Sequence, residues 1–308
     1  MSDIVTELSK SLKLDSWYLT NIINRSYFYY KDYTISKANG KKRHIAQPSP
    51  ELKTLQYWLV KNVFSHFPIS DVAKAYNHGD SILKNAEVHQ SARHILHIDI
   101  DSFFPSIHSS HLINVFSRNK DIWSKLGFDQ QSQKVICNIC FRDDSLCIGA
   151  VSSPIISNII MYGFDVALKE YCQVNHYNYT RYADDIFISS KHYIPQNVLS
   201  LIQREILKLG FTLNQKKTRF YSPKGQRRVT GITITDNGEL SIGLANRKKI
   251  KRMIYQQLVH GTENPSVVLG HLAFLKSIEP NTHDNYIIKY SQYCSGDMLD
   301  AIKKHSSQ

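Results

Sequence analysis

Apolar and polar residues alternate along this 308-residue chain in short segments that predict a mixture of helices and strands. The clearest helix begins at Ser49-Pro50, a polar cap followed by proline in the first turn, and keeps apolar residues on one face as far as Phe67. Apolar residues at every third or fourth position predict more helices. These lie, in chain order, over residues 109–141, 153–172 and 195–209, and over 245–308 with starts near Asn246 and at Asn264-Pro265.

Short runs rich in Ile, Val, Tyr, Phe and Thr predict the strands. The run from Ile95 to Ile100 has the length and composition of a buried strand, although Asp99 interrupts it. Other strands are predicted over residues 178–181, 186–189, 211–214, 219–222, 229–235 and 240–242, with turn signals at residues 223–225 and 236–238. The order strand, helix, hairpin, helix, strand predicts an α+β unit of the ferredoxin-like βαββαβ type.

Three acidic residues in these strands point to metal-dependent chemistry. Asp184 and Asp185 stand side by side at the turn between two predicted strands, and like charges this close are unfavourable unless a cation neutralises them. Asp99 lies in a buried strand, where an unpaired carboxylate is costly. If the two elements are neighbours, the three carboxylates form a site for two Mg²⁺ ions, which favour oxygen ligands and assist phosphoryl transfer. For the Asp-Asp pair alone, a solvated turn is the alternative.

The positive charge of the chain is concentrated in one region. The formal net charge is +12, and residues 201–260 hold 13 Lys and Arg against three acids, a net charge of +10. A localised basic region is typical of nucleic-acid-binding proteins, with a solvated basic face as the alternative. No apolar run approaches the roughly 20 residues that span a bilayer, and the N-terminus lacks a signal peptide's apolar core, so we expect a cytoplasmic protein. The five irregularly spaced cysteines predict no disulfide framework, and Cys137 and Cys140 are expected to pack in the core.

In this order the motifs resemble those of reverse transcriptases. Asp99 is followed by Phe103-Phe104, then by a Gly-x-x-x-Ser-Pro-x-x-Ser-Asn block over residues 149–158, and then by Tyr-Ala-Asp-Asp over residues 182–185. Further matches are residues 42–45, 52–56, 210–214 and 217–218. Two elements resemble the retron subgroup in particular: the Asn-Ala-x-x-His signature of residues 85–89 and the triplet Val229-Thr230-Gly231. The resemblance covers about residues 40–235.

The resemblance implies a right-hand polymerase fold with fingers, a ferredoxin-like palm and a helical thumb. Residues 1–90 would form the fingers, to which residues 112–148 return. Residues 91–111 and 149–243 would form the palm, and residues 244–308 the thumb. The expected reaction is attack of a strand's 3′-hydroxyl on the α-phosphate of an incoming nucleotide, with pyrophosphate leaving.

The resemblance also implies roles for single residues of the palm. Asp99, Asp184 and Asp185, with the carbonyl of Ile100, would hold two Mg²⁺ ions. Phe104 would lie beneath the sugar and exclude a 2′-hydroxyl, unless it is a core residue like Phe103. The pattern departs from that of the family at Ile148, where many members have Gln, and at Ser102, where a further Asp is frequent. Neither of these two positions is assigned a role.

Three more residues would contact the incoming nucleotide. Arg43, together with Lys42, is expected to bind the triphosphate, because guanidinium and ammonium groups match phosphate charge. For Lys42, as for Lys41 beside it, a solvated basic turn is the alternative. Lys217 resembles the family's lysine near the pyrophosphate, where it would donate a proton to the leaving group. Gly149 would let the backbone approach the nucleotide closely.

RNA contacts are expected in two places. The retron resemblance implies that Asn85, His89 and the triplet Val229-Thr230-Gly231 recognise a structured RNA, although on their own these residues are more often structural. The segment from Asn246 to Ile254 predicts a basic thumb helix with one apolar face. Its phosphate-binding residues would be Arg247, Lys248, Lys251 and Arg252.

The resemblance therefore implies a retron reverse transcriptase that uses dNTPs and Mg²⁺. It would copy its cognate structured non-coding RNA (msr-msd) from a 2′-hydroxyl primer into a branched RNA–DNA molecule (msDNA). A role in defence against phage, with a separate effector or toxin protein as partner, is implied as well. The alternatives are another bacterial reverse transcriptase, of a diversity-generating element or group II intron type, and a non-catalytic RNA-binding scaffold.

Overall fold

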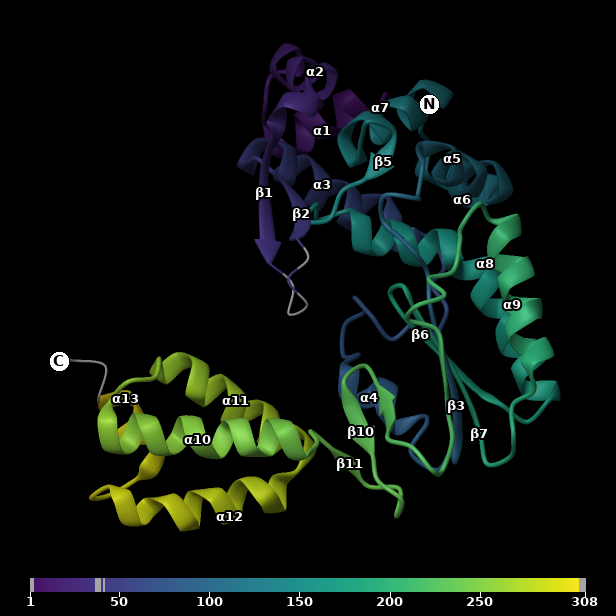
Figure 1. The fold of residues 1–308 in the computed structure, drawn as a ribbon. Coiled ribbons are helices and arrows are strands. Elements are labelled where there is room, and N and C mark those ends of the chain that lie inside the picture. Colours follow the sequence, from purple (N-terminus) through teal and green to yellow (C-terminus); the bar gives the residue numbers. More distant parts are fainter. Residues whose placement is uncertain (1–2, 37–39, 41, 305–308) are drawn as a thin grey trace.

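The computed structural model describes residues 3–36, 40 and 42–304 of the chain. Figure 1 shows three parts: a mostly helical part with a two-stranded hairpin, a central sheet with helices, and a group of helices at the C-terminal end. In the described residues, no helix is long enough and apolar enough to cross a membrane.

The N-terminal part is mostly helical. Its elements are α1 (Ile4–Leu12), α2 (Ser16–Asn24), the 3₁₀ helix η1 (Ser26–Tyr29), β1 (Tyr30–Ser36), β2 (Lys42–Pro48), α3 (Pro50–Asn62) and the 3₁₀ helix η2 (Phe64–His66). The predicted helix from Pro50 is confirmed, with its last turn set apart as η2. The antiparallel β1–β2 hairpin was not predicted, because β1 is exposed along almost its whole length and has no apolar alternation.

The central sheet has four antiparallel strands in the order β6-β7-β3-β8. Its strands are β3 (His94–Asp99), β6 (Asn178–Tyr182), β7 (Asp185–Ser190) and β8 (Arg219–Tyr221), and α8 (Ser153–Val174) and α9 (Gln196–Lys208) connect them. This is the predicted βαββαβ order with β3 and β7 at the centre. Central strands are buried on both faces, which explains why an acidic residue in either of them is unusual.

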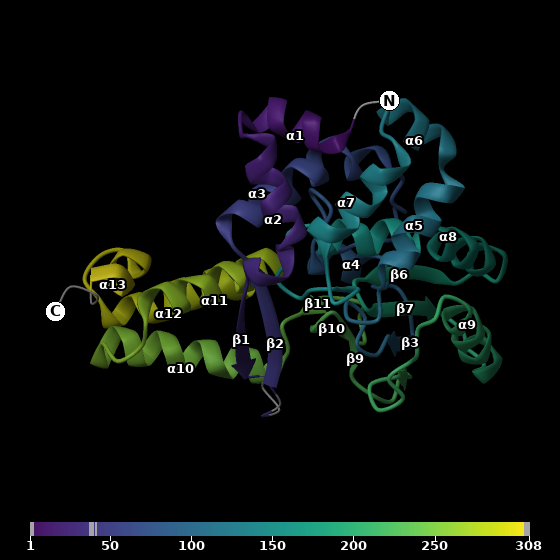
Figure 2. The same cartoon turned by 90° about the horizontal axis from the view of Figure 1, so that it is seen from above.

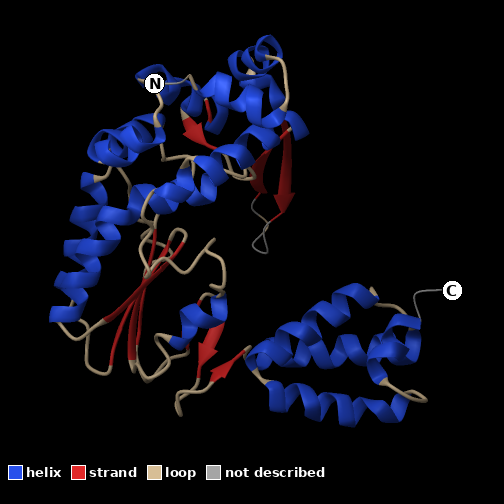
Figure 3. Cartoon of the chain, turned by 180° about the vertical axis from the view of Figure 1, so that it is seen from behind, coloured by secondary structure: helices blue, strands red, loops and turns tan. Residues whose placement is uncertain are grey.

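The two faces of the sheet meet different partners because side chains alternate along a strand. Leu96 and Ile98 of β3 lie in the main core, which also holds residues of α8 and α9. Ile95 lies in a second cluster with Phe187 of β7 and with residues of α4 (Ile82–Glu87) and the hairpin that follows β8. Figures 2 and 3 show α9 and α4 on opposite sides of the sheet.

Two of the predicted strands are wrong in detail. Residues 211–214 form no strand but make a single bridge from Leu213 to Ile100. The predicted strand over 229–235 is two short strands, β9 (Arg227–Val229) and β10 (Ile232–Ile234), joined by Thr230 and Gly231. Both turn residues have positive φ, 46° and 86°, as a tight hairpin turn requires. A third short strand, β11 (Leu240–Ser241), pairs with β10.

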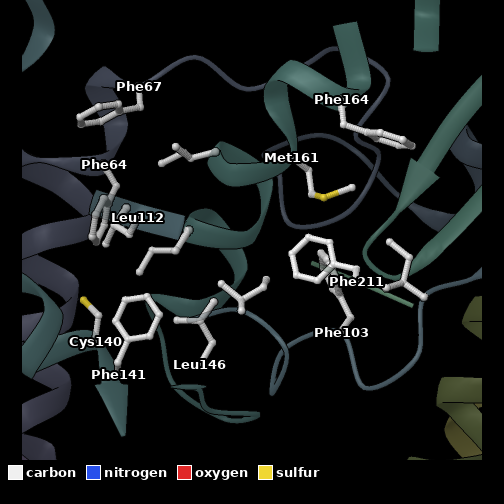
Figure 4. Packing of buried hydrophobic residues seen from close by; sticks show 14 of the residues in the cluster. Phe64, Phe67, Phe103, Leu112, Cys140, Phe141, Leu146, Met161, Phe164 and Phe211 are labelled. Carbon is white, nitrogen blue, oxygen red and sulfur yellow. The ribbon is translucent and has the colours of Figure 1, made fainter. Parts of the chain in front are cut away.

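The segment between β3 and α8 packs into the same core as the N-terminal helices. It contains α5 (Ser109–Arg118), α6 (Lys120–Leu126), α7 (Gln130–Cys140), β4 (Phe141–Arg142) and β5 (Ser145–Leu146). Cys137 and Cys140 are buried there, as expected, and burial raises the pKa of the Cys137 thiol to about 12. Figure 4 shows how this core continues from Phe64 and Cys140 to Phe103 and Phe211 beside the sheet.

The C-terminal helices form a core of their own. They are α10 (Leu244–His260), α11 (Pro265–Ile278), α12 (Pro280–Tyr290), the 3₁₀ helix η3 (Ser291–Tyr293) and α13 (Met298–Lys304). Their buried side chains form a cluster that begins at Ile242 and is separate from the main core. The carboxylate of Glu279 accepts a hydrogen bond from the Ile242 amide at 2.7 Å and pairs with Arg247, and so it joins these helices to the end of β11.

Candidate active site

The three predicted acidic residues meet at one end of the central strands. Asp99 is the last residue of β3 and Asp185 the first of β7, and the two are directly paired across the antiparallel register. Asp184 lies in the turn before β7, where its carbonyl accepts a hydrogen bond from the Ile100 amide at 2.9 Å. Sheet pairing therefore brings together Asp99 and Asp185, which are 86 positions apart in the sequence.

The carboxylates sit in an environment that disfavours their charge. The side chain of Asp99 is almost fully buried, and burial raises its pKa, as does the nearby charge of Asp185. Burial, followed by the charges of Asp185 and Asp99, raises the pKa of Asp184 to about 6. A cation would lower this electrostatic cost.

Two side chains already contact the acidic residues. The ammonium Nζ of Lys217 lies 2.5 Å from Oδ2 of Asp99. The Nε2 atom of His97 lies 2.6 Å from Oδ1 of Asp185, and the imidazole stacks on the Phe187 ring with centroids 4.7 Å apart. The sequence analysis did not identify His97 as a site residue. Its place two residues before Asp99 on the same strand puts both side chains on the same face of the sheet.

The residues present fit a metal site. In the part of the chain that the structure describes, no three Asp, Glu, His or Cys side chains already surround one point as ligands. Lys217 and His97 each contact one oxygen of an acidic residue at this site. Oδ1 of Asp99, by contrast, is buried and finds no hydrogen-bond partner among the described residues. A buried, unpartnered carboxylate oxygen beside two other carboxylates is the donor set that a hard divalent cation requires.

A buried ion pair holds the turn that carries Asp184. The guanidinium of Arg181 is fully buried and bidentate to Asp165 of α8, with N–O distances of 2.9 and 2.6 Å. Its Nη1 donates to the Ala183 carbonyl at 3.1 Å, and Tyr179 donates its hydroxyl to Asp165 at 2.7 Å. Ala183 has a left-handed φ of 54°. The sequence analysis did not identify Arg181, Asp165 and Tyr179 either. An arginine within a predicted strand is nevertheless a signal, because a buried arginine requires an acidic partner.

A pocket of about 890 Å³ opens over the acidic residues. Its lining contains Asp99, Ile100 and Asp184 of the acidic site and, around them, Arg43, Lys42, Phe104, Lys217, Ser102 and Ile148. Arg43 lies in β2 and not in a turn, and its exposed side chain lines the pocket. Phe103 is buried against Phe211, whereas Phe104 is half-buried and faces the pocket.

Gly149 packs closely against β2. Its φ is 113°, and a Cβ atom would lie 2.9 Å from Cγ2 of Ile45 and 3.1 Å from the Ala46 carbonyl oxygen. Glycine is therefore needed so that this loop can pack against β2, where the Ala46 amide donates to the Ile148 carbonyl at 3.0 Å. The expected approach of Gly149 to the nucleotide stays a prediction beside this contact.

The retron signature residues are structural in this fold. Nδ2 of Asn85 lies 3.4 Å from Oγ1 of Thr230, so the two signatures touch. Both nitrogens of His89 lie 2.7 Å from hydroxyls, those of Ser189 and Thr180, and burial lowers the pKa of His89 to about 3. Asn85, His89 and Val229 have no exposed surface, so direct RNA contact by their side chains is corrected to a packing role.

The remaining signature residues reach the surface. Thr230 and Gly231 line a second pocket, of about 370 Å³, together with Arg228 and, from the acidic site, His97 and Asp185. Of the predicted thumb cations, Lys248, Lys251 and Arg252 are exposed on α10. Arg247 pairs with Glu279 and donates to Oγ of Ser241 at 3.2 Å, so it joins α10 to its neighbours, and its expected phosphate contact stays a prediction.

Comparison with known proteins agrees with this geometry. A family model described as reverse transcriptase (RNA-dependent DNA polymerase) matches residues 35–234. The retron Ec83 reverse transcriptase of Escherichia coli is 30% identical over 295 residues, 90% of this chain and 91% of the relative. The retron Ec86 reverse transcriptase of the same organism is 31% identical over 293 residues, 93% of this chain and 88% of the relative.

The likeness to solved structures concerns the fold alone. The apo telomerase of Candida tropicalis superposes with a TM-score of 0.50 at 10% sequence identity, over 90% of this chain and 61% of that one. The present chain thus spans less than two thirds of the telomerase chain. The fold is the right-hand polymerase fold that the sequence predicts. The family match and the two relatives place the chain among the retron reverse transcriptases, which makes it an RNA-directed DNA polymerase.

Proposed function

We propose that this enzyme copies its own structured non-coding RNA (msr-msd) into DNA by nucleotidyl transfer with two Mg²⁺ ions, primed from a 2′-hydroxyl, so that the product is a branched RNA–DNA molecule (msDNA). One observation carries the proposal. In a chain related to retron enzymes, Asp99, Asp184 and Asp185 converge beneath a pocket that also presents Arg43 and Lys217.

The acidic residues and the carbonyl of Ile100 would hold the ions. Bound there, the ions would supply activation of the attacking hydroxyl and neutralise charge on the leaving pyrophosphate. The protein's own contribution is positioning and charge. Support comes from the unpartnered Oδ1 of Asp99 and from the pKa of Asp184, which burial and then the charge of Asp185 raise to about 6.

The other pocket residues act on the nucleotide. Arg43 binds the triphosphate, and Phe104 lies beneath the sugar. Lys217 donates a proton to the pyrophosphate. Its side chain is 54% exposed while Nζ contacts Asp99, so the ammonium can move to a phosphate oxygen without crossing the core. These roles rest on the pocket that the three residues share.

The three parts of the fold correspond to three functions. Residues 1–90 with 112–148 act as fingers, residues 91–111 and 149–243 as the palm, and residues 244–308 as the thumb. The separate core of the C-terminal helices supports a thumb that is a unit of its own. The RNA contacts are the turn Thr230-Gly231, beside Asp185, and the exposed cations of α10.

The cellular role follows from the kinship with retron enzymes. We propose a cytoplasmic reverse transcriptase that acts in defence against phage together with a separate effector protein. The relatives' names support the retron class. The effector remains to be found by co-purification from cells that express the complete locus.

Nucleic acid that co-purifies with the wild-type enzyme tests the proposal. Sequencing before and after treatment with RNase and with a 2′-5′ debranching enzyme should reveal DNA joined to one RNA nucleotide. Asp185→Asn should co-purify with the same RNA and no DNA. Linear DNA without a branch would favour another reverse transcriptase class, and RNA without DNA in the wild-type sample would favour a non-catalytic scaffold.

A further inference from the structure

Tyr76 has a backbone conformation that large side chains rarely adopt. Its φ is 69°, in the left-handed region, where a bulky residue is a genuine outlier. The residue is nevertheless half-exposed and lines the pocket above Asp99 and Asp184. Strain of this kind persists only where the surrounding structure imposes it, and it is concentrated at functional sites.

The residues on either side of Tyr76 are tied to the palm. The Lys74 amide donates to the Arg181 carbonyl at 2.7 Å, beside a bridge between Ala73 and Arg181. On the other flank, Nδ2 of Asn158 donates to the Ala75 carbonyl at 3.0 Å. Asn158 is fully buried and is the last residue of the Ser-Pro-x-x-Ser-Asn block. Ala73 and Ala75 are buried as well, so the segment that leads into Tyr76 is held on both the Arg181 side and the Asn158 side.

The Tyr76 side chain meets the ring of Phe104. The two ring centroids are 6.2 Å apart with the planes tilted by 59°. Phe104 also touches Phe103, with centroids 5.6 Å apart, and Phe103 is in turn buried against Phe211. Phe104 therefore has a rigid neighbour from the core in Phe103 and a second neighbour, in a strained loop, in Tyr76.

We propose that Tyr76 is a positioning residue for sugar selection, which holds the Phe104 ring at the place where it excludes a 2′-hydroxyl. Asn158 acts one step further away, by fixing the loop through Ala75. The inference rests on the proposed function, in which Phe104 lies beneath the sugar of the incoming nucleotide. Without Tyr76, the Phe104 ring loses one of its two aromatic neighbours and gains room to turn away from the sugar.

The test compares dNTP and rNTP incorporation in a double-mutant cycle. Single-nucleotide kcat/KM values for both substrates are measured with wild type, Tyr76→Gly, Phe104→Val and the double variant. Glycine is chosen because it accepts the positive φ without strain, so the variant should fold at least as well as wild type. Tyr76→Gly should reduce discrimination against rNTPs by about 3- to 10-fold, the worth of one aromatic pair.

The double variant decides how Tyr76 acts. If the residue works through the Phe104 ring, discrimination in the double variant should equal that of Phe104→Val alone. The inference is overturned if Tyr76→Gly discriminates like wild type, or if it lowers discrimination by the same factor with and without Phe104.

Matched variants separate this role from general effects. Tyr76→Phe keeps the ring and should keep wild-type discrimination. Tyr57→Ala removes a comparably exposed tyrosine on α3, outside the pocket, and should change neither substrate's kinetics. A wild-type enzyme that incorporates no dNTP refutes the proposed function itself. Incorporation with unchanged selectivity in the Tyr76 variants refutes only the present inference.

Discussion

Arg181 donates a hydrogen bond from Nη1 to the carbonyl of Ala183, 3.1 Å away, while its guanidinium is fully buried and paired with Asp165. The turn that carries Asp184 is thus held from inside the palm by an ion pair rather than by its own short loop. A buried charge pair contributes little net stability, but removing one partner leaves the other uncompensated. We infer that the pair positions the turn that carries Asp184 rather than stabilising the fold.

Arg181→Met should destabilise the fold strongly, by about 3–5 kcal/mol, because Asp165 would be left charged and buried. The triple variant Arg181→Met/Asp165→Leu/Tyr179→Phe removes the complete polar set and should regain most of that stability. Incorporation should stay low in both, since the Ala183 carbonyl has lost its donor. Urea denaturation and primer extension provide the two measurements. A triple variant with wild-type activity would contradict the positioning role.

Asp184→Asn should abolish nucleotide incorporation while it leaves folding and RNA binding nearly intact. The pKa of Asp184 is raised to about 6, so ionisation of this carboxyl group is less favourable in the folded state than in the unfolded state. Without added metal at pH 7.5, the variant should be more stable than wild type by at most about 3 kcal/mol. The gain should shrink as the pH falls below 6 and disappear well below the unfolded-state pKa of 3.8, where the acid is protonated in both states. Polymerase activity in this variant would show that Asp184 is not a metal ligand.

His89 should make stability fall in acid. Burial lowers its pKa from 6.5 to about 3, so the unfolded state binds the proton more readily than the folded state. The contribution of neutral His89 is present above pH 6.5 and is lost as the pH falls toward 3, at up to about 1.4 kcal/mol per pH unit. His89→Gln should flatten this part of the profile, measured by urea unfolding between pH 7 and 4. Equal slopes for the two proteins would contradict the prediction.

RNA affinity should fall steeply as salt rises. Each phosphate contact contributes roughly 0.7–0.9 to the slope of log K against log salt. Lys248→Gln/Arg252→Gln should lower that slope by up to about twice this amount, as measured by filter binding at several salt concentrations. Arg247→Gln is the matched control on the same helix: because Arg247 pairs with Glu279, its loss should weaken folding more than it changes the slope. An unchanged slope in the double variant would argue against a phosphate-binding α10.

Much of the fold was predictable because local patterns carry it. The helix from Pro50 shows its cap and apolar face in the sequence, and β3 and β7 are runs of apolar β-formers. The β1–β2 hairpin and the division of 229–235 into β9 and β10 were not predictable in the same way. The β1–β2 hairpin lacks apolar alternation. The division into β9 and β10 depends on positive φ values at Thr230 and Gly231, and a threonine gives no sequence signal for such a conformation.

The roles of the signature residues needed the tertiary structure. Sequence motifs associate Asn85 and His89 with RNA, but both side chains are buried and bind hydroxyls of Thr230, Ser189 and Thr180. Likewise, only the structure shows that Gly149 packs against Ile45 and Ala46 of β2 too closely for a Cβ atom. A motif shows which residue type occupies a position. The structure shows which neighbours that residue contacts.

By itself, the sequence determined the three acidic residues, the order of the palm elements and the basic character of α10, because these follow from residue type and local periodicity. Which atoms meet could be seen in the folded chain alone: Lys217 contacts Asp99, His97 contacts Asp185, Arg181 contacts Ala183 and Tyr76 contacts Phe104. The physical reason is that such contacts depend on strand register and on the packing of segments far apart in the chain, and neither leaves a local pattern.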